Sequence, residues 1–227
     1  MTLLQAIILG VVEGVTEFLP ISSTGHLILA SRLLGLSQTV SQKSFEIAIQ
    51  LGAIASVIVL YWRRFLEPAV VSRVLVAFLP TGLIGFALYR VVKTYLFDSE
   101  ALVLWALGLG GVALIVFELL HREGDHAVPD VASIPYLKAL LIGVFQSLSI
   151  VPGVSRAGAT IVGGLILGLS RSTIVEFSFL LAVPTKLAAT GYDLLKNAST
   201  FGPNSLVFSP QVSLRLFSSP CSASNFC

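Results

Sequence analysis

The sequence predicts an all-α, polytopic membrane protein with an inverted-topology repeat and two re-entrant helix-break-helix hairpins. Of its 227 residues, 55% are hydrophobic and 11% are charged, whereas soluble domains carry about 25% charged residues. Several long stretches lack charge, and two further apolar stretches are interrupted by Pro, Gly and Ser. This composition excludes a disordered chain and a disulfide scaffold, and a net charge of +2 favours no nucleic-acid partner.

Four segments are predicted to cross the membrane, at Phe45–Tyr61, about 73–92, 101–120 and Ser172–Leu195. The second and third have charge-free centres, and the first carries a single acid, Glu46. With its flanks, each is long enough to cross about 30 Å of hydrocarbon.

Two apolar regions, Leu3–Leu36 and Tyr136–Leu169, are broken in the middle by FLPISSTGH and IVPGVSRAG. The helix after each break has about 12 residues, or about 18 Å, which is too short to span. Irregular backbone survives at membrane depth only where protein or a water-filled cavity covers it. Both regions are therefore predicted to be hairpins that begin and end on the same side of the membrane.

The two hairpins resemble each other at an offset of 133 residues. The matched pairs include Glu13 with Gln146, Ser22 with Ser155, and Gly25 with Gly158. Three predicted crossings separate the hairpins, and this odd number places them on opposite faces with their breaks near the midplane.

The chain is predicted to form one membrane domain over 1–203, with repeats at about 3–61 and 136–195. A serine-rich tail follows at 204–227. Three arginines in the 62–73 connection favour a cytoplasmic position for it, so the first hairpin opens outward and the second inward.

Glu13 and Glu17 lie four residues apart on one helix face, close to His26. Carboxylates in an apolar segment are costly and are functional by default. Their spacing suits a divalent cation such as Mg²⁺ or Ca²⁺, or acid–base chemistry. The alternative is a structural pair bonded to backbone or to Arg156.

The first break supplies Ser22, Ser23, Thr24, Gly25 and His26 at the start of a helix. Hydroxyls and free N–H groups at a helix start make an anion site. His26 could act as nucleophile or proton carrier, or could simply bond to a neighbouring helix.

The second break repeats this design and adds Arg156 beside Ser155, with Thr160 one turn on and Gln146 before the break. A guanidinium at a broken helix in the membrane needs a carboxylate or a phosphate. Together the two breaks suit phosphoryl transfer or hydrolysis, in which catalysis is mostly positioning and charge neutralisation.

Other polar residues carry less weight. Glu46 and Gln50 share a helix face and could support the site, as could Glu176 and Lys186, which could equally lie near helix ends. His121 and His126 belong to a charged loop and are expected to be solvated.

At these residues the chain resembles the undecaprenyl-diphosphate phosphatases, also called bacitracin-resistance proteins. The resemblance rests on VVEGVTEFLPISSTGH (11–26), PGVSRAGATI (152–161), FEIAIQLGA (45–53) and EFSFLLAVP (176–184), and it runs from about residue 3 to 195. It implies a metal-dependent, multi-pass hydrolase of the bacterial inner membrane. Such an enzyme removes the terminal phosphate of a polyprenyl diphosphate and so recycles the lipid carrier for cell-wall synthesis.

By the same resemblance, Glu13 and Glu17 correspond to the family's acidic pair, Ser23 and His26 to its SSTGH residues, and Ser155 with Arg156 to its PGxSR residues. The predicted catalytic residues are Glu17, Ser23, His26 and Arg156, and Glu13 and Glu17 are expected to hold the cation. The predicted substrate-binding residues are Ser22, Thr24, Gly25, Gln146, Ser155 and Thr160. The nucleophile is left open between Ser23, His26 and water, and so is a homo-oligomeric state.

The chain departs from the family pattern at Ala157, where a second serine is usual, and after about Asn204, where apolar spans are expected but a serine-rich tail follows. We therefore expect a truncated or aberrant end, which bears on the activity of the chain. A competing hypothesis is a transporter or flippase, because inverted repeats with broken helices are typical of transporters. A soluble-type acid phosphatase is disfavoured because no histidine follows Ser155-Arg156.

Overall fold

The computed structural model describes residues 1–36, 40–91, 100–122 and 127–196, and the tail predicted at 204–227 lies outside these ranges. Within them the secondary structure is helical, apart from one isolated bridge between Val128 and Leu169. The prediction of an all-α fold is confirmed. The helices are α1 (Leu3–Thr16), α2 (Ser23–Leu33), α3 (Val40–Leu60), α4 (Pro68–Val91), α5 (Glu100–Leu120), α6 (Tyr136–Gln146), α7 (Arg156–Ile166) and α8 (Arg171–Lys196), with short 3-10 turns η1 (Arg64–Leu66), η3 (Val131–Ser133) and η4 (Ser147–Ile150).

Three helices in the described part of the chain are long and apolar enough to cross a membrane. They are Pro68–Leu88 in α4, Ala101–Leu120 in α5 and Arg171–Tyr192 in α8. The remaining predicted crossing, Phe45–Tyr61, falls in α3, whose apolar part, Phe45–Leu60, is shorter. The chain is therefore a polytopic membrane protein.

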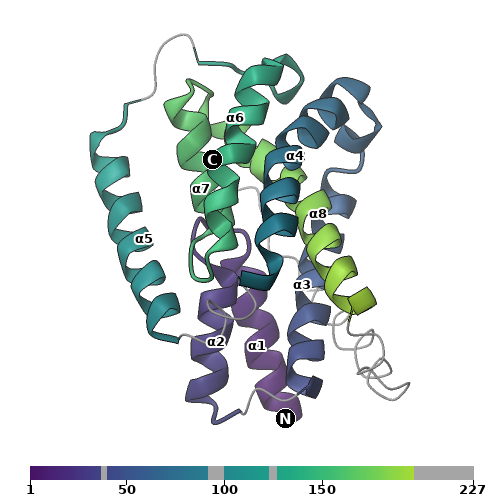
Figure 1. Cartoon of the computed structure of the whole chain (residues 1–227), viewed down its shortest axis with the longest axis vertical. Coiled ribbons are helices and arrows are strands. Elements are labelled where there is room, and N and C mark those ends of the chain that lie inside the picture. Colours follow the sequence, from purple (N-terminus) through teal and green to yellow (C-terminus); the bar gives the residue numbers. More distant parts are fainter. Residues whose placement is uncertain (37–39, 92–99, 123–126, 197–227) are drawn as a thin grey trace.

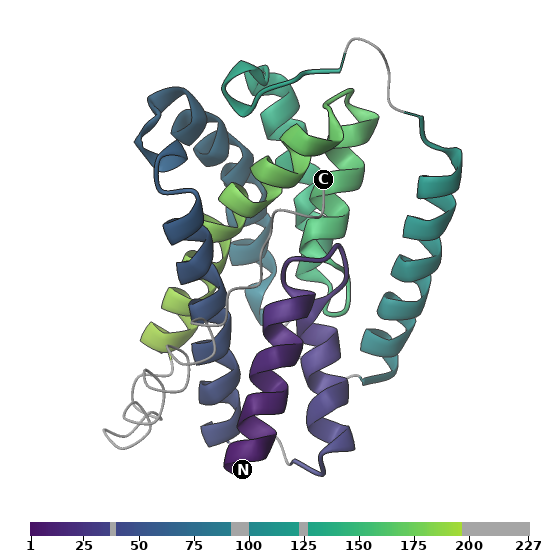
Figure 2. The ribbon, with the colours of Figure 1, turned by 180° about the vertical axis from the view of Figure 1, so that it is seen from behind.

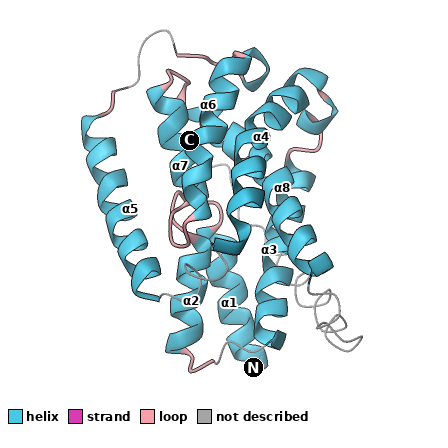
Figure 3. Ribbon diagram, viewed as in Figure 1, coloured by secondary structure: helices cyan, strands magenta, loops and turns pink. Residues whose placement is uncertain are grey.

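The two broken regions form helical hairpins at opposite ends of the molecule (Figures 1 and 2). The first hairpin, α1 and α2, occupies the end that holds the N-terminus, and the second hairpin, α6 and α7, occupies the other end. Figure 3 shows their connecting loops close together between the two hairpins. The loop of the first hairpin packs against the start of α7, because a Cβ added at Gly158 would lie 3.1 Å from the carbonyl oxygen of Pro20.

The second helix of each hairpin begins and ends in the same way. The hydroxyl of Ser22 accepts a hydrogen bond from the Gly25 N–H at the start of α2, and Ser155 accepts from Gly158 at the start of α7. Both helices have 11 residues. Each is followed by a glycine with positive φ, 67° at Gly35 and 76° at Gly168, which terminates the helix in a conformation that side chains disfavour.

The largest buried cluster joins α4, α6, α7 and α8, so the second hairpin sits in the main core of the protein. Small residues allow this close packing. A Cβ on Gly143 of α6 would collide with the carbonyl oxygen of Ala77 on α4. The fully buried members of the cluster include Val70, Ala77, Ile134, Ile142, Ile174, Phe177, Leu180 and Leu181.

Arg64 connects several segments of the chain at the end of the molecule where α6 begins. Its guanidinium donates to Glu176 at 2.7 Å, to Asp130 at 2.9 Å and to Glu67 at 3.2 Å. The hydrogen bond to Glu176 is the main cause that raises the pKa of Arg64 above its ordinary value. Glu176 thus lies near the start of α8, which is one of the two positions predicted for it. Its contact with Arg64 joins the basic 62–73 connection to α8.

Candidate active site

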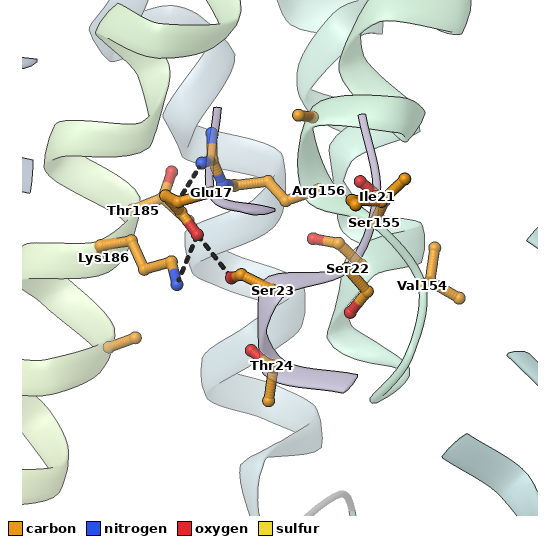
Figure 4. A pocket seen from close by; sticks show the side chains of 13 residues that line it. Glu17, Ile21, Ser22, Ser23, Thr24, Val154, Ser155, Arg156, Thr185 and Lys186 are labelled. Atoms are coloured by element: carbon orange, nitrogen blue, oxygen red, sulfur yellow. Dashed lines mark hydrogen bonds and ion pairs between the residues drawn. The ribbon is translucent and has the colours of Figure 1, made fainter. Parts of the chain in front are cut away.

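A cavity of about 160 Å³ lies where the loops of the two hairpins meet (Figure 4). Its wall comes from both loops, from the first residues of α2 and α7, and from α8. The polar residues that line it are Glu17, Ser22, Ser23, Thr24, Ser149, Ser155, Arg156, Thr185 and Lys186. Six of the predicted site residues are therefore brought together: Glu17, Ser22, Ser23, Thr24, Ser155 and Arg156.

Glu17 connects the two hairpins at this cavity. Its Oε1 accepts from the Arg156 guanidinium at 2.7 Å, and its Oε2 accepts from the Ser23 hydroxyl at 2.6 Å. The ammonium of Lys186 lies 3.4 Å from the same Oε2. Figure 4 shows Glu17 between Arg156 and Lys186. The structural pairing with Arg156 that the sequence offered as an alternative is present, and it lies in the cavity wall.

One nitrogen of the Arg156 guanidinium has no acceptor among the residues that the structure describes. Its two terminal nitrogens donate to Glu17 and to the carbonyl oxygen of Ser178, but its Nε is buried without an acceptor in the described part of the chain. A buried guanidinium donor without a partner is costly. The Arg156 side chain also lines the cavity, so its positive charge lies in the cavity wall.

Two helix N-termini add to this anion-binding character. The first N–H groups of α2 and α7 have no acceptor within their own helices, because those helices begin at Ser23 and Arg156. Their dipoles also favour negative charge at these positions. Ala157, which replaces the usual serine, lines the same wall and contributes a methyl group there.

Glu13 lies one helical turn before Glu17 and is 1% exposed. Neither of its carboxylate oxygens has a hydrogen-bond partner among the described residues. Over those same residues, no group of three or more His, Cys, Asp or Glu side chains could hold a metal. Mg²⁺ is usually bound through one or two carboxylates together with water and substrate phosphates. Glu13 could serve as such a carboxylate, whereas both oxygens of Glu17 already contact Arg156, Ser23 or Lys186.

Two predicted site residues of the first hairpin, His26 and Gly25, do not line the cavity. The Nδ1 of His26 lies 2.7 Å from the carbonyl oxygen of Ser22, so Nδ1 carries a proton and donates to its own helical turn. His26 therefore bonds to its own helical turn and not to a neighbouring helix, which was the predicted alternative. His26 is also absent from the residues that line the cavity. Gly25 packs against Leu107 of α5, where it allows α2 and α5 to approach closely.

Two residues of the second hairpin are buried in helix packing and do not line the cavity. Gln146 donates to the hydroxyls of Thr81 and Thr185, both at 3.0 Å, and its Oε1 has no partner in the described structure. Thr160 shares a 2.6 Å hydrogen bond with Ser178. Both side chains are fully buried, and Gln146 reaches the cavity only through Thr185.

Lys186, Thr185 and Ser149 line the cavity although the sequence did not place them in the binding set. Lys186 also donates to Gln50 of α3 at 3.0 Å, which gives Gln50 the supporting position proposed for it. Glu46 instead accepts from Ser31. The signal for Lys186 was its charge within an apolar span, and helical position alone did not show that it faces the breaks.

Comparisons with known proteins all indicate the same family. The family described as bacitracin resistance protein BacA matches residues 6–222. A protein named undecaprenyl-diphosphatase from a Sulfurihydrogenibium species is 56% identical over 201 residues, covering 88% of this chain and 79% of that protein. Proteins of the same name from Persephonella marina and Aquifex aeolicus are 53% and 51% identical over 202 residues, again covering 88% of this chain, and 79% and 78% of their own lengths.

Proposed function

This chain belongs to the bacitracin resistance protein BacA family, and we propose that it is an undecaprenyl-diphosphatase acting at the cavity between the two hairpins. The reaction converts undecaprenyl diphosphate and water to undecaprenyl phosphate and inorganic phosphate. The observation that carries the proposal is the contact of Glu17 with both Ser23 and Arg156, because it joins a hydroxyl, a carboxylate and a guanidinium at one anion-binding wall.

The substrate's headgroup and its tail occupy different places. The cavity of about 160 Å³ is smaller than pockets that enclose drug-sized ligands, which are about 300–1,000 Å³. It suits a diphosphate headgroup and leaves the polyprenyl tail outside, among apolar helix surfaces and lipid. The Arg156 guanidinium and the N-termini of α2 and α7 bind the phosphates.

Ser23 is the nucleophile that the geometry favours over His26, because its hydroxyl lines the cavity and already donates to Glu17 at 2.6 Å. The Ser23 oxygen bonds to the terminal phosphorus while its proton passes to Glu17. The bond from that phosphorus to the bridging oxygen breaks, and undecaprenyl phosphate leaves with the oxygen. Water then attacks the phosphoserine, Ser23 regains its proton from Glu17, and the released phosphate keeps both water protons.

A divalent cation, Mg²⁺ or Ca²⁺, is proposed as the cofactor, held by Glu13 and Glu17. When bound it would neutralise phosphate charge. The unpartnered oxygens of Glu13 support this assignment, because a buried carboxylate without donors needs a cation or a proton.

The membrane placement follows from the hairpins. We infer that both are re-entrant, that residues 3–61 and 136–195 form an inverted repeat within one domain over 1–203, and that the diphosphate reaches the cavity from the outer face of the bacterial inner membrane. This placement is supported by hairpins that begin at opposite ends of the molecule and by breaks that touch. Such an enzyme recycles the lipid carrier for peptidoglycan synthesis and confers resistance to bacitracin.

A transporter or flippase is the second candidate, favoured by the same opposed hairpins, which are typical of secondary transporters. A lipid phosphatase and a lipid transporter would differ in whether the phosphate bond breaks. Ser23 and Glu17 in direct contact favour the phosphatase, because transport has no need for a carboxylate-bonded hydroxyl at the anion site.

One experiment separates the two. The purified chain in detergent is given undecaprenyl diphosphate with Mg²⁺ or Ca²⁺, and released phosphate is measured for the wild type and for Ser23→Ala, with Ser72→Ala on the surface of α4 as a matched control. We expect release by the wild type and the control, and its loss in Ser23→Ala. Absence of release, together with metal-independent lipid movement in liposomes, would favour transport.

A further inference from the structure

Within the described part of the chain, the Lys186 ammonium has two contacts and therefore one N–H group without a partner. Its Nζ donates to Gln50 at 3.0 Å and lies 3.4 Å from Glu17, and an ammonium carries three protons. The side chain is 17% exposed and lines the cavity, so the remaining N–H lies at a wall where a ligand could accept it. A lysine inside an apolar span is costly unless it is paired or functional.

The charges at the cavity wall do not balance. Glu17 is the one carboxylate among the lining residues, and it faces two cations, Arg156 and Lys186. Arg156 already satisfies Glu17 with a direct 2.7 Å bond, whereas Lys186 lies at the longer distance of 3.4 Å. Among the lining residues there are thus two cations and one carboxylate, and Lys186 is the cation that lies farther from that carboxylate. The buried carboxylate of Glu13 lies one helical turn behind this wall.

The two cations lie on different oxygens of Glu17. Arg156 bonds to Oε1, whereas Lys186 and the Ser23 hydroxyl both approach Oε2. Lys186 thus shares an atom with the proposed nucleophile, and Arg156 is the first residue of α7. A diphosphate in the cavity would meet one cation per phosphate, with Lys186 on the side of the phosphorus that Ser23 attacks.

We propose that Lys186 binds the terminal phosphate while Arg156 binds the inner one, so that Lys186 makes the site selective for a diphosphate over a monophosphate. This inference rests on the proposed function for the identity of the lipid, and it adds the residue that recognises the terminal phosphate, which is transferred to Ser23. Undecaprenyl phosphate, the product, lacks the group that Lys186 holds, which favours its release.

Gln50 is the positioning residue for this ammonium. It lies on α3 and its amide oxygen accepts from the Lys186 Nζ, which orients a flexible side chain toward the cavity. Without Gln50 the ammonium would keep its charge but lose one of its two fixed contacts. Loss of Gln50 should therefore weaken phosphate binding less than loss of Lys186 does.

The test measures the binding of inorganic pyrophosphate and of inorganic phosphate to the purified full chain by calorimetry, at one fixed Mg²⁺ concentration. The variants are Lys186→Met, Lys186→Arg and Gln50→Leu, and Lys138→Met on α6 is the matched control outside the cavity lining. A hydrogen bond to a charged group contributes a factor of about 10 to 100 in affinity.

We expect Lys186→Met to lose pyrophosphate affinity by about 10- to 100-fold and phosphate affinity by less, so that the preference for pyrophosphate largely disappears. Lys186→Arg should retain most of the preference, and Gln50→Leu should lose about 3- to 10-fold in pyrophosphate affinity. Lys138→Met should match the wild type.

Unchanged preference for pyrophosphate in Lys186→Met would overturn the proposal. If that variant does not fold, an unchanged preference in Gln50→Leu would overturn it instead. The lipid hydrolysis assay is a separate readout. A wild type that binds pyrophosphate through Lys186 but releases no phosphate from undecaprenyl diphosphate would overturn the proposed function and leave this anion site standing.

Discussion

The first hairpin, α1–α2, and the second, α6–α7, have corresponding positions 133 residues apart, and they differ in the side chains that fill them. Ser22 and Ser155 cap helices of equal length, and Gly35 and Gly168 end them. The first residue of the capped helix is Ser23 in one hairpin and Arg156 in the other.

This difference shows how a two-fold scaffold acquires an asymmetric site. The backbone supplies the same anion-binding helix start twice, because the same caps and glycines recur. One hairpin then carries the carboxylate and the hydroxyl, and the other carries the guanidinium that pairs with them. Each hairpin alone has half of the groups that the proposed reaction needs.

Glu17 marks the largest difference between the hairpins, since the corresponding position in the second is Ile150. Glu17→Gln removes the charge that Ser23, Arg156 and Lys186 share. We expect phosphate release from undecaprenyl diphosphate to fall by about 10²- to 10⁴-fold, the usual contribution of a positioned proton acceptor.

Single-turnover assays on monodisperse protein would measure this effect, with Glu118→Gln on the exposed end of α5 as the control. Glu118 is 59% exposed, so its replacement should leave the rate unchanged. Equal rates for the wild type and Glu17→Gln would mean that the first hairpin does not supply the acid–base chemistry.

A reciprocal exchange of Glu13 and Gln146 tests why one hairpin has an acid and the other an amide. The hydroxyl protons of Thr81 and Thr185 are donated to backbone carbonyls, so both oxygens must accept from residue 146. Gln146→Glu would place a carboxylate against two acceptors, and we expect a loss of about 3 kcal/mol or more in stability.

Glu13→Gln is the matched change, because the Glu13 oxygens have no hydrogen-bond partner among the described residues. It removes a buried charge, so the stability should stay the same or rise while hydrolysis falls. Thermal unfolding in detergent with and without Mg²⁺ would measure both variants. Equal stability for Gln146→Glu and Glu13→Gln would show that the contacts of residue 146 with Thr81 and Thr185 do not require an amide donor.

The two hairpins also differ in how tightly their helices pack, and we expect a smaller effect on stability from this difference. Gly143 on α6 faces the backbone of Ala77, whereas a Cβ at Gly14 on α1 would meet nothing within 4 Å. Gly143→Ala should cost about 1–3 kcal/mol through overpacking, and Gly14→Ala should be neutral or stabilise α1 by about 0.5–1 kcal/mol. Matching unfolding temperatures for the two variants would contradict the tighter packing of the second hairpin.

The smallest effect concerns the shared caps. Ser22→Ala and Ser155→Ala each remove a hydroxyl that accepts a backbone N–H, and each should cost about 1 kcal/mol. The Ser155 bond measures 3.0 Å and the Ser22 bond 3.4 Å, so Ser155→Ala should be the more damaging of the two. Thermal unfolding of both variants, compared with Ser72→Ala on the surface of α4, would reveal any reversal of this order.

Much of this arrangement could be predicted from the sequence. Long runs without charge predicted the membrane-length helices, because the hydrocarbon of a bilayer favours such runs. Pro20, Pro152 and the serines and glycines beside them gave the breaks, since these residues interrupt helices and cap new ones. The meeting of Glu17 with Arg156 followed from the expectation that the two breaks lie together.

The direction of individual side chains could not be predicted in the same way. Helical periodicity assigns Gln146, Thr160 and Lys186 to faces of their helices, but the packing of α4, α6, α7 and α8 decides what each face meets. Gln146 and Thr160 turned into that packing, and Lys186 turned to the cavity. His26 bonds to its own turn because a carbonyl oxygen lies within its reach.

The contact between Glu17 and Arg156 also has a consequence for how the chain is made. The two residues are 139 positions apart in the sequence. At a synthesis rate of about 5–20 residues per second, Arg156 is made roughly 7 to 30 seconds after Glu17. During that interval the growing chain contains the acid and does not yet contain its cation. The first hairpin must therefore be held by water, protons or insertion machinery until the second arrives, and a chain stopped before Arg156 would carry the acids of the site without their partner.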